Sequence, residues 1–141
     1  MSGSLTIGQA AARSGISAKM IRYYDDVGLY RPEGRSASGY RLFNGKDLHA
    51  LRFIRRARDL GFSLDEIREL LALWRDERRS SAEVKVLALR HVADLEQRIR
   101  ELQEMATTLR HLAHHCHGDD RPDCPILADL AEEARQPKRT A

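Results

Sequence analysis

Between Ala88 and Leu109, apolar residues recur at steps that alternate between four and three, within a predicted helix from Ser80 or Ser81 to about His114. This spacing is typical of an α-helix that packs in a coiled coil. At ~1.5 Å per residue the helix would be roughly 50 Å long, more than one small domain can cover. We therefore predict a dimerisation helix over residues 80–115 that pairs with a second copy of the chain. Burial of the seam against the chain's own N-terminal part is the alternative. The seam residues are Ala88, Val92, Leu95, Ile99, Leu102, Ala106 and Leu109.

The composition is that of a soluble, largely helical protein. The chain has 141 residues, of which 42% are hydrophobic and 32% are charged. No run approaches eighteen apolar residues, and the first residues lack the basic and apolar regions of a signal peptide. We therefore expect a cytoplasmic protein with no membrane partner. A reducing compartment disfavours a standing disulfide.

The charge is divided unevenly along the chain. Residues 1–62 hold 11 Lys and Arg against 5 Asp and Glu, whereas residues 63–141 hold 13 against 16. A basic N-terminal part beside a mildly acidic remainder indicates that one part binds a polyanion, with nucleic acid as the leading candidate.

Two short helices in the basic part predict an element that could read DNA. The first runs over about residues 5–15, with Thr6 as its cap and Gly15 at its end. The second follows Ser17 and ends at Gly28, so the pair forms a helix-turn-helix whose second helix can enter the major groove. We predict that this helix presents three side chains to DNA, and a helical hairpin buried in a core is the alternative. The three are Lys19, Arg22 and Tyr24.

Residues 31–43 have the composition of a tight hairpin, which would form a wing beside the recognition helix. Arg35 and Arg41 would reach the DNA backbone, and Tyr40 offers a hydroxyl for a phosphate. Leu42 and Phe43 are expected in the core.

The next two helices complete a predicted N-terminal domain over residues 1–75. Asn44 caps a helix over about 45–59, and Ser63 begins a capping box for a helix to about Trp74. The first of these helices would bury an apolar face and keep Arg55, Arg56 and Arg58 outside, and we count Arg58 among the DNA contacts. Its expected apolar contributions are Leu48, Leu51, Phe53, Ile54 and Leu60.

The only two cysteines, Cys116 and Cys124, lie in one loop beyond the long helix. Two thiolates in a short loop favour a site for a soft metal ion. Seven residues between them is a wide spacing for zinc, and no second pair is present, so a disulfide or two unrelated thiols stay open. Four histidines crowd the loop and could be ligands or surface residues, at positions 111, 114, 115 and 117.

Three longer segments and the cysteine loop together resemble the MerR family of winged-helix transcription regulators, from Leu5 to about Pro125. The segments are Ile-Arg-Tyr-Tyr-Asp at 21–25, Arg-Ser-Ala-Ser-Gly-Tyr-Arg at 35–41 and Ile-Arg-Arg-Ala-Arg-Asp-Leu-Gly-Phe-Ser-Leu-Asp-Glu-Ile at 54–67. The loop Cys-His-Gly-Asp-Asp-Arg-Pro-Asp-Cys-Pro-Ile-Leu, residues 116–127, is similar to that of the copper-efflux branch, of the CueR and HmrR kind.

The resemblance implies a fold and a mode of action. The fold is mainly α: a winged helix-turn-helix, a long helix in an antiparallel coiled coil, a metal-binding loop and short helix over 116–135, and a disordered tail over 136–141. Such a homodimer occupies double-stranded promoter DNA, and bound metal distorts an overlong spacer so that RNA polymerase can engage. An enzyme is not expected, because the chain has no nucleotide-binding glycine motif and no nucleophile paired with a base.

The same resemblance implies Cu(I) as the effector, with Ag(I) or Au(I) as chemically similar ions. Cu(I) accepts two ligands in a line, so Cys116 and Cys124 could complete its coordination. The partner's long helix would bring Ser81 and Lys85 near the ion, and the copper branch carries serine where branches that sense divalent ions carry cysteine. A divalent-metal sensor of the same fold and a thiol redox regulator are the alternatives.

Overall fold

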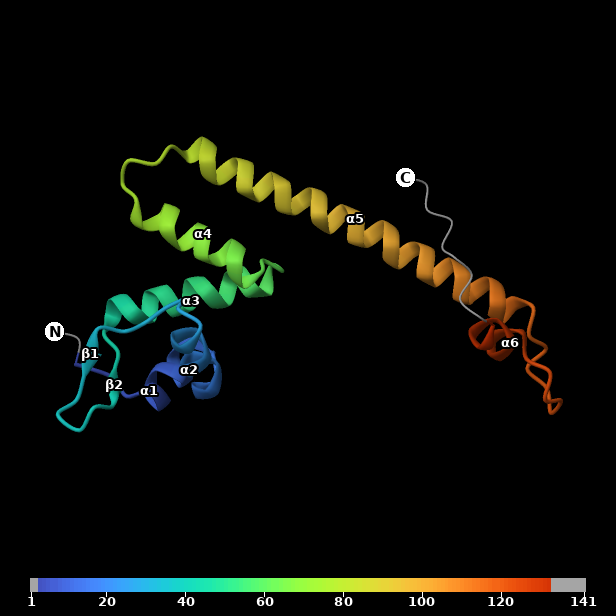
Figure 1. Cartoon of the computed structure of the whole chain (residues 1–141), viewed down its shortest axis with the longest axis horizontal. Helices are drawn as coiled ribbons and strands as arrows, with labels where there is room; N and C mark the ends of the chain where they lie inside the picture. The colour runs from blue at the N-terminus through green and yellow to red at the C-terminus, as the bar shows by residue number, and fades with distance from the viewer. Residues whose placement is uncertain (1–2, 133–141) are drawn as a thin grey trace. The chain divides into compact units, whose positions relative to one another are not determined.

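A computed structural model describes residues 3–132 of the chain (Figure 1). The chain divides after Val86 into two compact units. The predicted tail over 136–141 and the last residues of the predicted 116–135 segment lie outside the described residues. Within the described part no helix is long and apolar enough to cross a membrane.

The mainly helical fold predicted from the sequence is confirmed. Six helices and one small antiparallel hairpin are formed by the described residues, and each helix begins within a few residues of its predicted start. The elements are α1 (Ile7–Ser14), α2 (Ala18–Asp26), β1 (Gly34–Arg35), β2 (Arg41–Leu42), α3 (Gly45–Asp59), α4 (Leu64–Arg75), α5 (Ser81–His114) and α6 (Pro125–Ala131).

Side-chain caps fix where the first four helices begin. The oxygens of Thr6, Ser17, Asn44 and Ser63 each accept a hydrogen bond from a backbone N–H in the first turn of the helix that follows. Such caps satisfy N–H groups that have no partner inside the helix. The predicted capping box at Ser63 is present, with Glu66 as its second member.

One hydrophobic core holds α1 to α4 together. Its most buried side chains come from all parts of the N-terminal unit and include Ile21, Phe43, Leu51, Ile54 and Ile67. Burial of each such side chain stabilises the fold by about 1.5–3 kcal/mol. Leu60 was predicted to join this core, but it is 49% exposed, because it lies at the C-cap of α3, beyond the last turn that packs inward.

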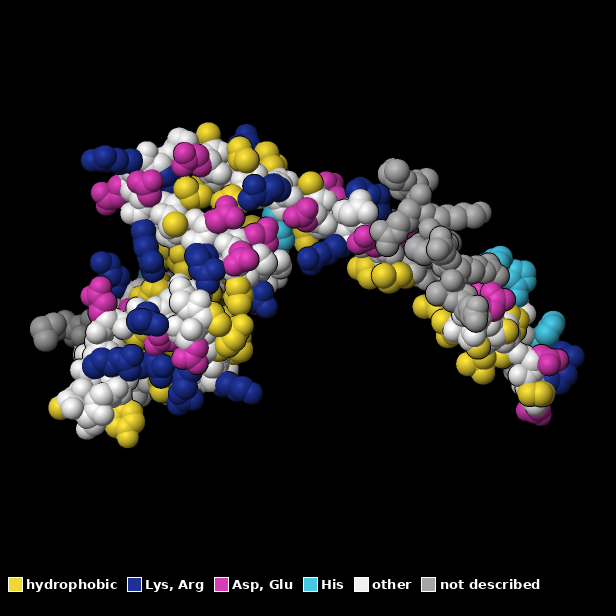
Figure 2. Space-filling model, viewed as in Figure 1, with side chains coloured by type: hydrophobic (Ala, Val, Ile, Leu, Met, Phe, Trp, Pro, Cys, Tyr) yellow, Lys and Arg dark blue, Asp and Glu magenta, His cyan; other side chains and the backbone are white. Residues whose placement is uncertain are grey.

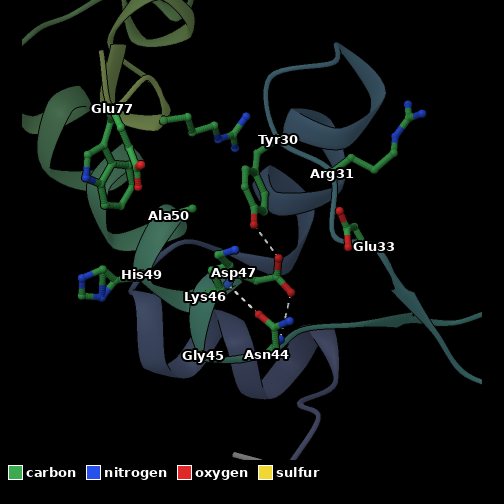
Figure 3. A pocket seen from close by; sticks show the side chains of 12 residues that line it. Tyr30, Arg31, Glu33, Asn44, Gly45, Lys46, Asp47, His49, Ala50 and Glu77 are labelled. Atoms are coloured by element: carbon green, nitrogen blue, oxygen red, sulfur yellow. Dashed lines mark hydrogen bonds between the residues drawn. The ribbon is translucent and has the colours of Figure 1, made fainter. Parts of the chain in front are cut away.

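A buried carboxylate, that of Asp47, lies in the first turn of α3. Asp47 accepts a hydrogen bond from the hydroxyl of Tyr30 and a second, at 2.8 Å, from the backbone N–H of Asn44 (Figure 3). Burial and the negative charge of Asp47 together raise the pKa of Tyr30 far above its usual value, so this phenol stays a hydrogen-bond donor.

The hairpin predicted as a wing is present. Gly34 pairs with Leu42 and Arg35 pairs with Arg41 across β1 and β2. The turn closes through the N–H of Ser36, which donates to the Tyr40 carbonyl at 2.8 Å. The wing is tied to the entry of α1, because Leu5 and Phe43 exchange two backbone hydrogen bonds of 2.7 and 2.8 Å.

Gly15 ends α1 in a conformation that only glycine adopts without strain. Its φ is 78°, and a Cβ built on it would lie 1.6 Å from Nη1 of Arg55. That nitrogen donates to the Gly15 carbonyl at 2.9 Å, and Arg52 donates to the Arg13 carbonyl. Two arginines of α3 therefore satisfy the C-terminal carbonyls of α1, where helices favour positive charge.

We predict that Gly15→Ala lowers the free energy of unfolding by about 1–2 kcal/mol, because alanine is strained at this φ and displaces Arg55. Gly8→Ala is the matched control: Gly8 lies inside α1, and nothing but Thr6 Oγ1, at 3.9 Å, meets an added Cβ. It should be neutral or stabilising. Urea denaturation of both variants checks this, and equal stability would contradict the role of Gly15.

Candidate nucleic-acid interface and metal site

The second helix of the helix-turn-helix exposes two of its predicted DNA contacts and buries the third. Lys19 and Arg22 are exposed on α2, and neither makes an ion pair within residues 3–132. Tyr24 is only 4% exposed and belongs to the core. This corrects the prediction that its phenol faces DNA: Tyr24 lies on the opposite face of α2 from the two cations.

Four of the predicted DNA contacts surround one groove of about 320 Å³ between α2 and the wing. Arg22 approaches from the helix, whereas Arg35, Tyr40 and Arg41 come from the hairpin. Tyr40 is among the most exposed aromatic residues of the described chain. Lys and Arg side chains gather over this unit in Figure 2. A groove with three guanidinium groups and a free phenol suits a phosphate backbone.

Asp25, which the sequence analysis did not single out, organises these arginines. Its carboxylate is 5% exposed and accepts hydrogen bonds of 2.7 Å from Nε of Arg31 and from Nε of Arg41. A nitrogen of Arg35 lies 3.9 Å away. A single buried anion at the end of α2 therefore holds the wing against the recognition helix.

The charge state of Asp25 follows from these contacts. Burial alone raises the pKa of its carboxyl group, but the hydrogen bonds and positive charges of Arg41 and Arg31 together outweigh burial and bring the pKa below its usual value. Asp25 is ionised at neutral pH. It neutralises part of the charge of arginines that are also available to an anionic ligand.

Arg58, the last predicted DNA contact, lies at the end of α3. Its Nη1 donates to the Phe62 carbonyl at 3.2 Å, which holds the turn into α4. Burial raises the pKa of the Tyr24 phenol, and the nearby charge of Arg58 acts in the opposite direction. The side chain of Arg58 is exposed, and its predicted contact with DNA stays a prediction.

The two cysteines are brought together by a turn at the end of α5 and by the start of α6. Cys116 follows the last turn of α5, and its N–H donates to the Ala113 carbonyl at 3.1 Å. Gly118 has a φ of 65°, and Asp119 binds the backbone N–H and side chain of Arg121, which turns the loop back. Cys124 is the N-cap residue of α6, with Pro125 in its first turn.

The sulfur of Cys124 lies where a thiolate is stabilised. Backbone hydrogen bonding from Leu127, then from Ile126, and a hydrogen bond from the Cys116 side chain lower the pKa of the Cys124 thiol, against the opposing effect of desolvation. The two side chains therefore lie near one another, and both cysteines are free thiols that are half-buried. The predicted pair is brought together as the wide spacing allows, without a disulfide.

The other residues predicted near the metal do not meet the cysteines within one described chain. Ser81 and Lys85 are exposed in the first turns of α5. Their predicted role needs a second copy of the chain and stays a prediction. The four histidines lie at or just after the end of α5, and the ring of His115 contacts those of His111 and His114.

A cavity of about 760 Å³ lies elsewhere (Figure 3). It is bounded by α3, the end of α4 and the start of the wing, and Tyr30 and Asp47 form part of its wall. None of the residues predicted to bind DNA or metal lines it.

Comparison with known proteins decides the family. The chain matches the MerR HTH family regulatory protein model over residues 5–74 and the model named MerR, DNA binding over residues 48–112. It is 57% identical over 132 residues to "Heavy metal-dependent transcription regulator 2" of Rhizobium meliloti (strain 1021), which covers 94% of this chain and 90% of the relative. The chain belongs to the MerR family.

Members of the MerR family are DNA-binding transcription regulators and not enzymes. The chain is also 44% identical to the HTH-type transcriptional regulator CueR of Salmonella typhimurium, over 90% of this chain and 92% of CueR. Two solved relatives extend the likeness to structure. The lead(II) complex of PbrR691 from Ralstonia metallidurans has a TM-score of 0.77 at 31% identity and covers 90% of this chain and 99% of its own.

The second solved relative is HiNmlR, a MerR family regulator that lacks the sensor domain, bound to promoter DNA. It has a TM-score of 0.53 at 29% identity and covers 77% of this chain and 86% of its own. The winged helix-turn-helix expected from the sequence is thereby confirmed as the MerR DNA-binding fold.

We predict that Asp25→Asn destabilises the protein by about 1–3 kcal/mol at neutral pH, because it removes the charge that two arginines bond. The carboxyl pKa is lower in the folded chain than its unfolded value of about 3.9. The loss should therefore be full above that pH and shrink as pH falls through the folded pKa. Denaturation of wild type and variant between neutral pH and pH about 3 measures this.

Asp65→Asn is the control, because Asp65 is 90% exposed in its pair with Arg68. Such pairs contribute about 0–1 kcal/mol. If both variants lose the same stability, the central role assigned to Asp25 is wrong.

Proposed function

We propose that this MerR-family chain is a Cu(I)-responsive transcription activator of copper-efflux genes that acts as a homodimer on promoter DNA. Ag(I) and Au(I) would be alternative effectors. The observation that carries the proposal is that one loop places Cys116 after the end of α5 and Cys124 at the start of α6, near one another, in a chain whose other unit is a DNA-binding domain. Its relative from Rhizobium meliloti is named a heavy metal-dependent transcription regulator, which supports a metal as the signal.

The donor set fits a soft monovalent ion. Two sulfur atoms are the only thiols of the chain, and one already lies where backbone N–H groups favour a thiolate. Cu(I) would take both sulfurs as ligands and needs no third, whereas a divalent ion such as Zn(II) prefers three or four ligands. The hard carboxylates of Asp119 and Asp120 suit a soft ion poorly, and Asp119 is already bonded to Arg121.

Two thiolates around one monovalent ion leave a net charge of −1. The N–H groups at the start of α6 offset part of it. We propose that Lys85 of the second copy supplies a counter-charge. Ser81 of that copy would not supply the third thiolate ligand that a divalent ion needs. Both side chains are exposed in the first turns of α5, where a partner could use them.

Dimerisation is supported by the surface of α5. Val92, Ile99, Leu102 and Leu109 are all exposed along it, and Figure 2 shows hydrophobic side chains gathered along an edge of this helix. A solvent-exposed apolar seam of this length is typical of a helix that packs against a partner. Two paired chains would present two reading heads to a two-fold operator.

At the promoter, we propose that Lys19, Arg22 and Arg35, together with Tyr40 and Arg41, contact DNA. The dimer would occupy the promoter with and without metal. Metal at the cysteine loop would bias the dimer toward a form that distorts an overlong spacer, so that RNA polymerase engages both promoter elements.

Arg22→Ala should weaken operator binding by roughly 1–3 kcal/mol, because Arg22 is exposed in the groove and has no ion-pair partner among the described residues. Arg110→Ala on α5 is the control, since it removes an exposed arginine outside the DNA-binding unit. Gel-shift titrations at stated salt, with and without metal, give the affinities. Unchanged affinity for Arg22→Ala, or an equal loss in the control, would sink the assignment.

Replacing either cysteine with serine should abolish metal-activated transcription and retain promoter occupancy. Cu(I) and Ag(I) should activate the wild type, whereas Zn(II) at the same free concentration should not, because two thiolates leave it under-coordinated. Transcription from the operator in vitro across buffered metals measures the response.

The outcomes separate the alternatives. A Zn(II) response that needs both cysteines would make the divalent-metal sensor correct. Activation by an oxidant without added metal, lost in each serine variant, would favour the thiol redox regulator.

A further inference from the structure

The last turn of α5 carries a cluster of imidazoles that the cysteine pair does not use. His111 and His115 are four residues apart, and the N–H of His115 donates to the His111 carbonyl at 3.3 Å. The helical spacing therefore continues to His115, one residue beyond the end of α5. Both side chains are exposed. On a helix, residues four apart lie on one face.

The rings lie slightly closer together than the separation that a shared ion requires. Their centroids are 4.4 Å apart, at an interplanar angle of 75°. Two imidazole nitrogens about 2.1 Å from one ion, at an angle of about 90–110°, would place the ring centres roughly 4.5–5.3 Å apart. Rotation of two exposed side chains could close this difference without any change in the backbone.

Nothing in the described part of the chain competes for these nitrogens. Neither ring makes a hydrogen bond or an ion pair within residues 3–132, and their recorded contacts are with each other and with His114, whose ring lies 5.7 Å from that of His115. A pair of histidines at this spacing on one helix face is the arrangement that holds zinc in other proteins.

We propose that His111 and His115 form a second metal site, for a borderline divalent ion such as Zn(II) or Ni(II), separate from the Cys116–Cys124 pair. Neutral imidazole suits these ions, whereas the two thiolates suit a soft monovalent ion. Water would complete the coordination, since the helix end is exposed. An ion held by both rings would bridge the last turn of α5, from which the cysteine loop departs.

The test uses the full chain with both cysteines replaced by serine, so that no thiolate contributes. Calorimetric titration with Zn(II), and separately with Ni(II), in metal-buffered solution should show a site that depends on both His111 and His115. In this background His111→Ala and His115→Ala should each lower the metal affinity of that site by about tenfold or more. Removal of a residue that only supports a ligand already costs about tenfold. His111→Gln keeps a polar side chain and should show the same loss, with helix content by circular dichroism as the check on folding.

His117→Ala is the matched control, because His117 lies in the same loop region but in neither ring contact. Its affinity should equal that of the parent. Loss of the site in His117→Ala, or full affinity in His111→Ala, would overturn the proposal. The result is independent of the proposed Cu(I) function, since the parent lacks both cysteines. If the histidines bind no metal, the proposed cysteine site is not affected. If they do, the cysteine site is not thereby established.

Discussion

The buried carboxylate of Asp25 is the interaction on which the DNA-binding unit depends. It lies at the end of α2 and forms ion pairs with Arg31, which precedes the wing, and with Arg41, which is part of the wing. A buried ion pair that loses one partner leaves an uncompensated charge. Loss of either the carboxylate or its arginines therefore destabilises the unit. The price is that part of the positive charge facing the groove is already neutralised. Arg22 and Lys19, which have no such partner in residues 3–132, keep their full charge for a polyanion.

The second unit depends on a different constraint. α5 continues over 34 residues with a seam of exposed apolar side chains. Helical propensity alone rarely stabilises an isolated helix in water, and an exposed apolar seam is typical of a binding surface. The DNA-binding unit has a core of its own, with Phe43, Leu51 and Ile67 fully buried. The two units therefore differ in kind: one is stabilised by its own packing, and the other exposes the surface through which we propose a second copy binds.

Local signals carried most of what the sequence could predict. The capping residues, Gly15 and the wing turn act over three or four residues, so they located each element closely. Tyr24 and Leu60 were misplaced because their burial is decided by which helix face meets the core, and that depends on packing between α1, α2 and α3. Asp25 was missed for the same reason. Its partners lie six and sixteen residues away and come together only when the wing folds back.

The metal loop shows where sequence and structure each contribute. Residue types alone indicated a soft ion, because two cysteines are too few for a tetrahedral site. The structure adds where the sulfurs lie: Cys124 is the N-cap residue of α6, where backbone N–H groups lower the pKa of its thiol, and Cys116 follows the end of α5. The loop between α5 and α6 therefore offers donors of two kinds: imidazoles on the last turn of α5, and the sulfurs of Cys116 and Cys124. A soft ion would take the sulfurs and a borderline ion the imidazoles, so ions of different class would not share a ligand.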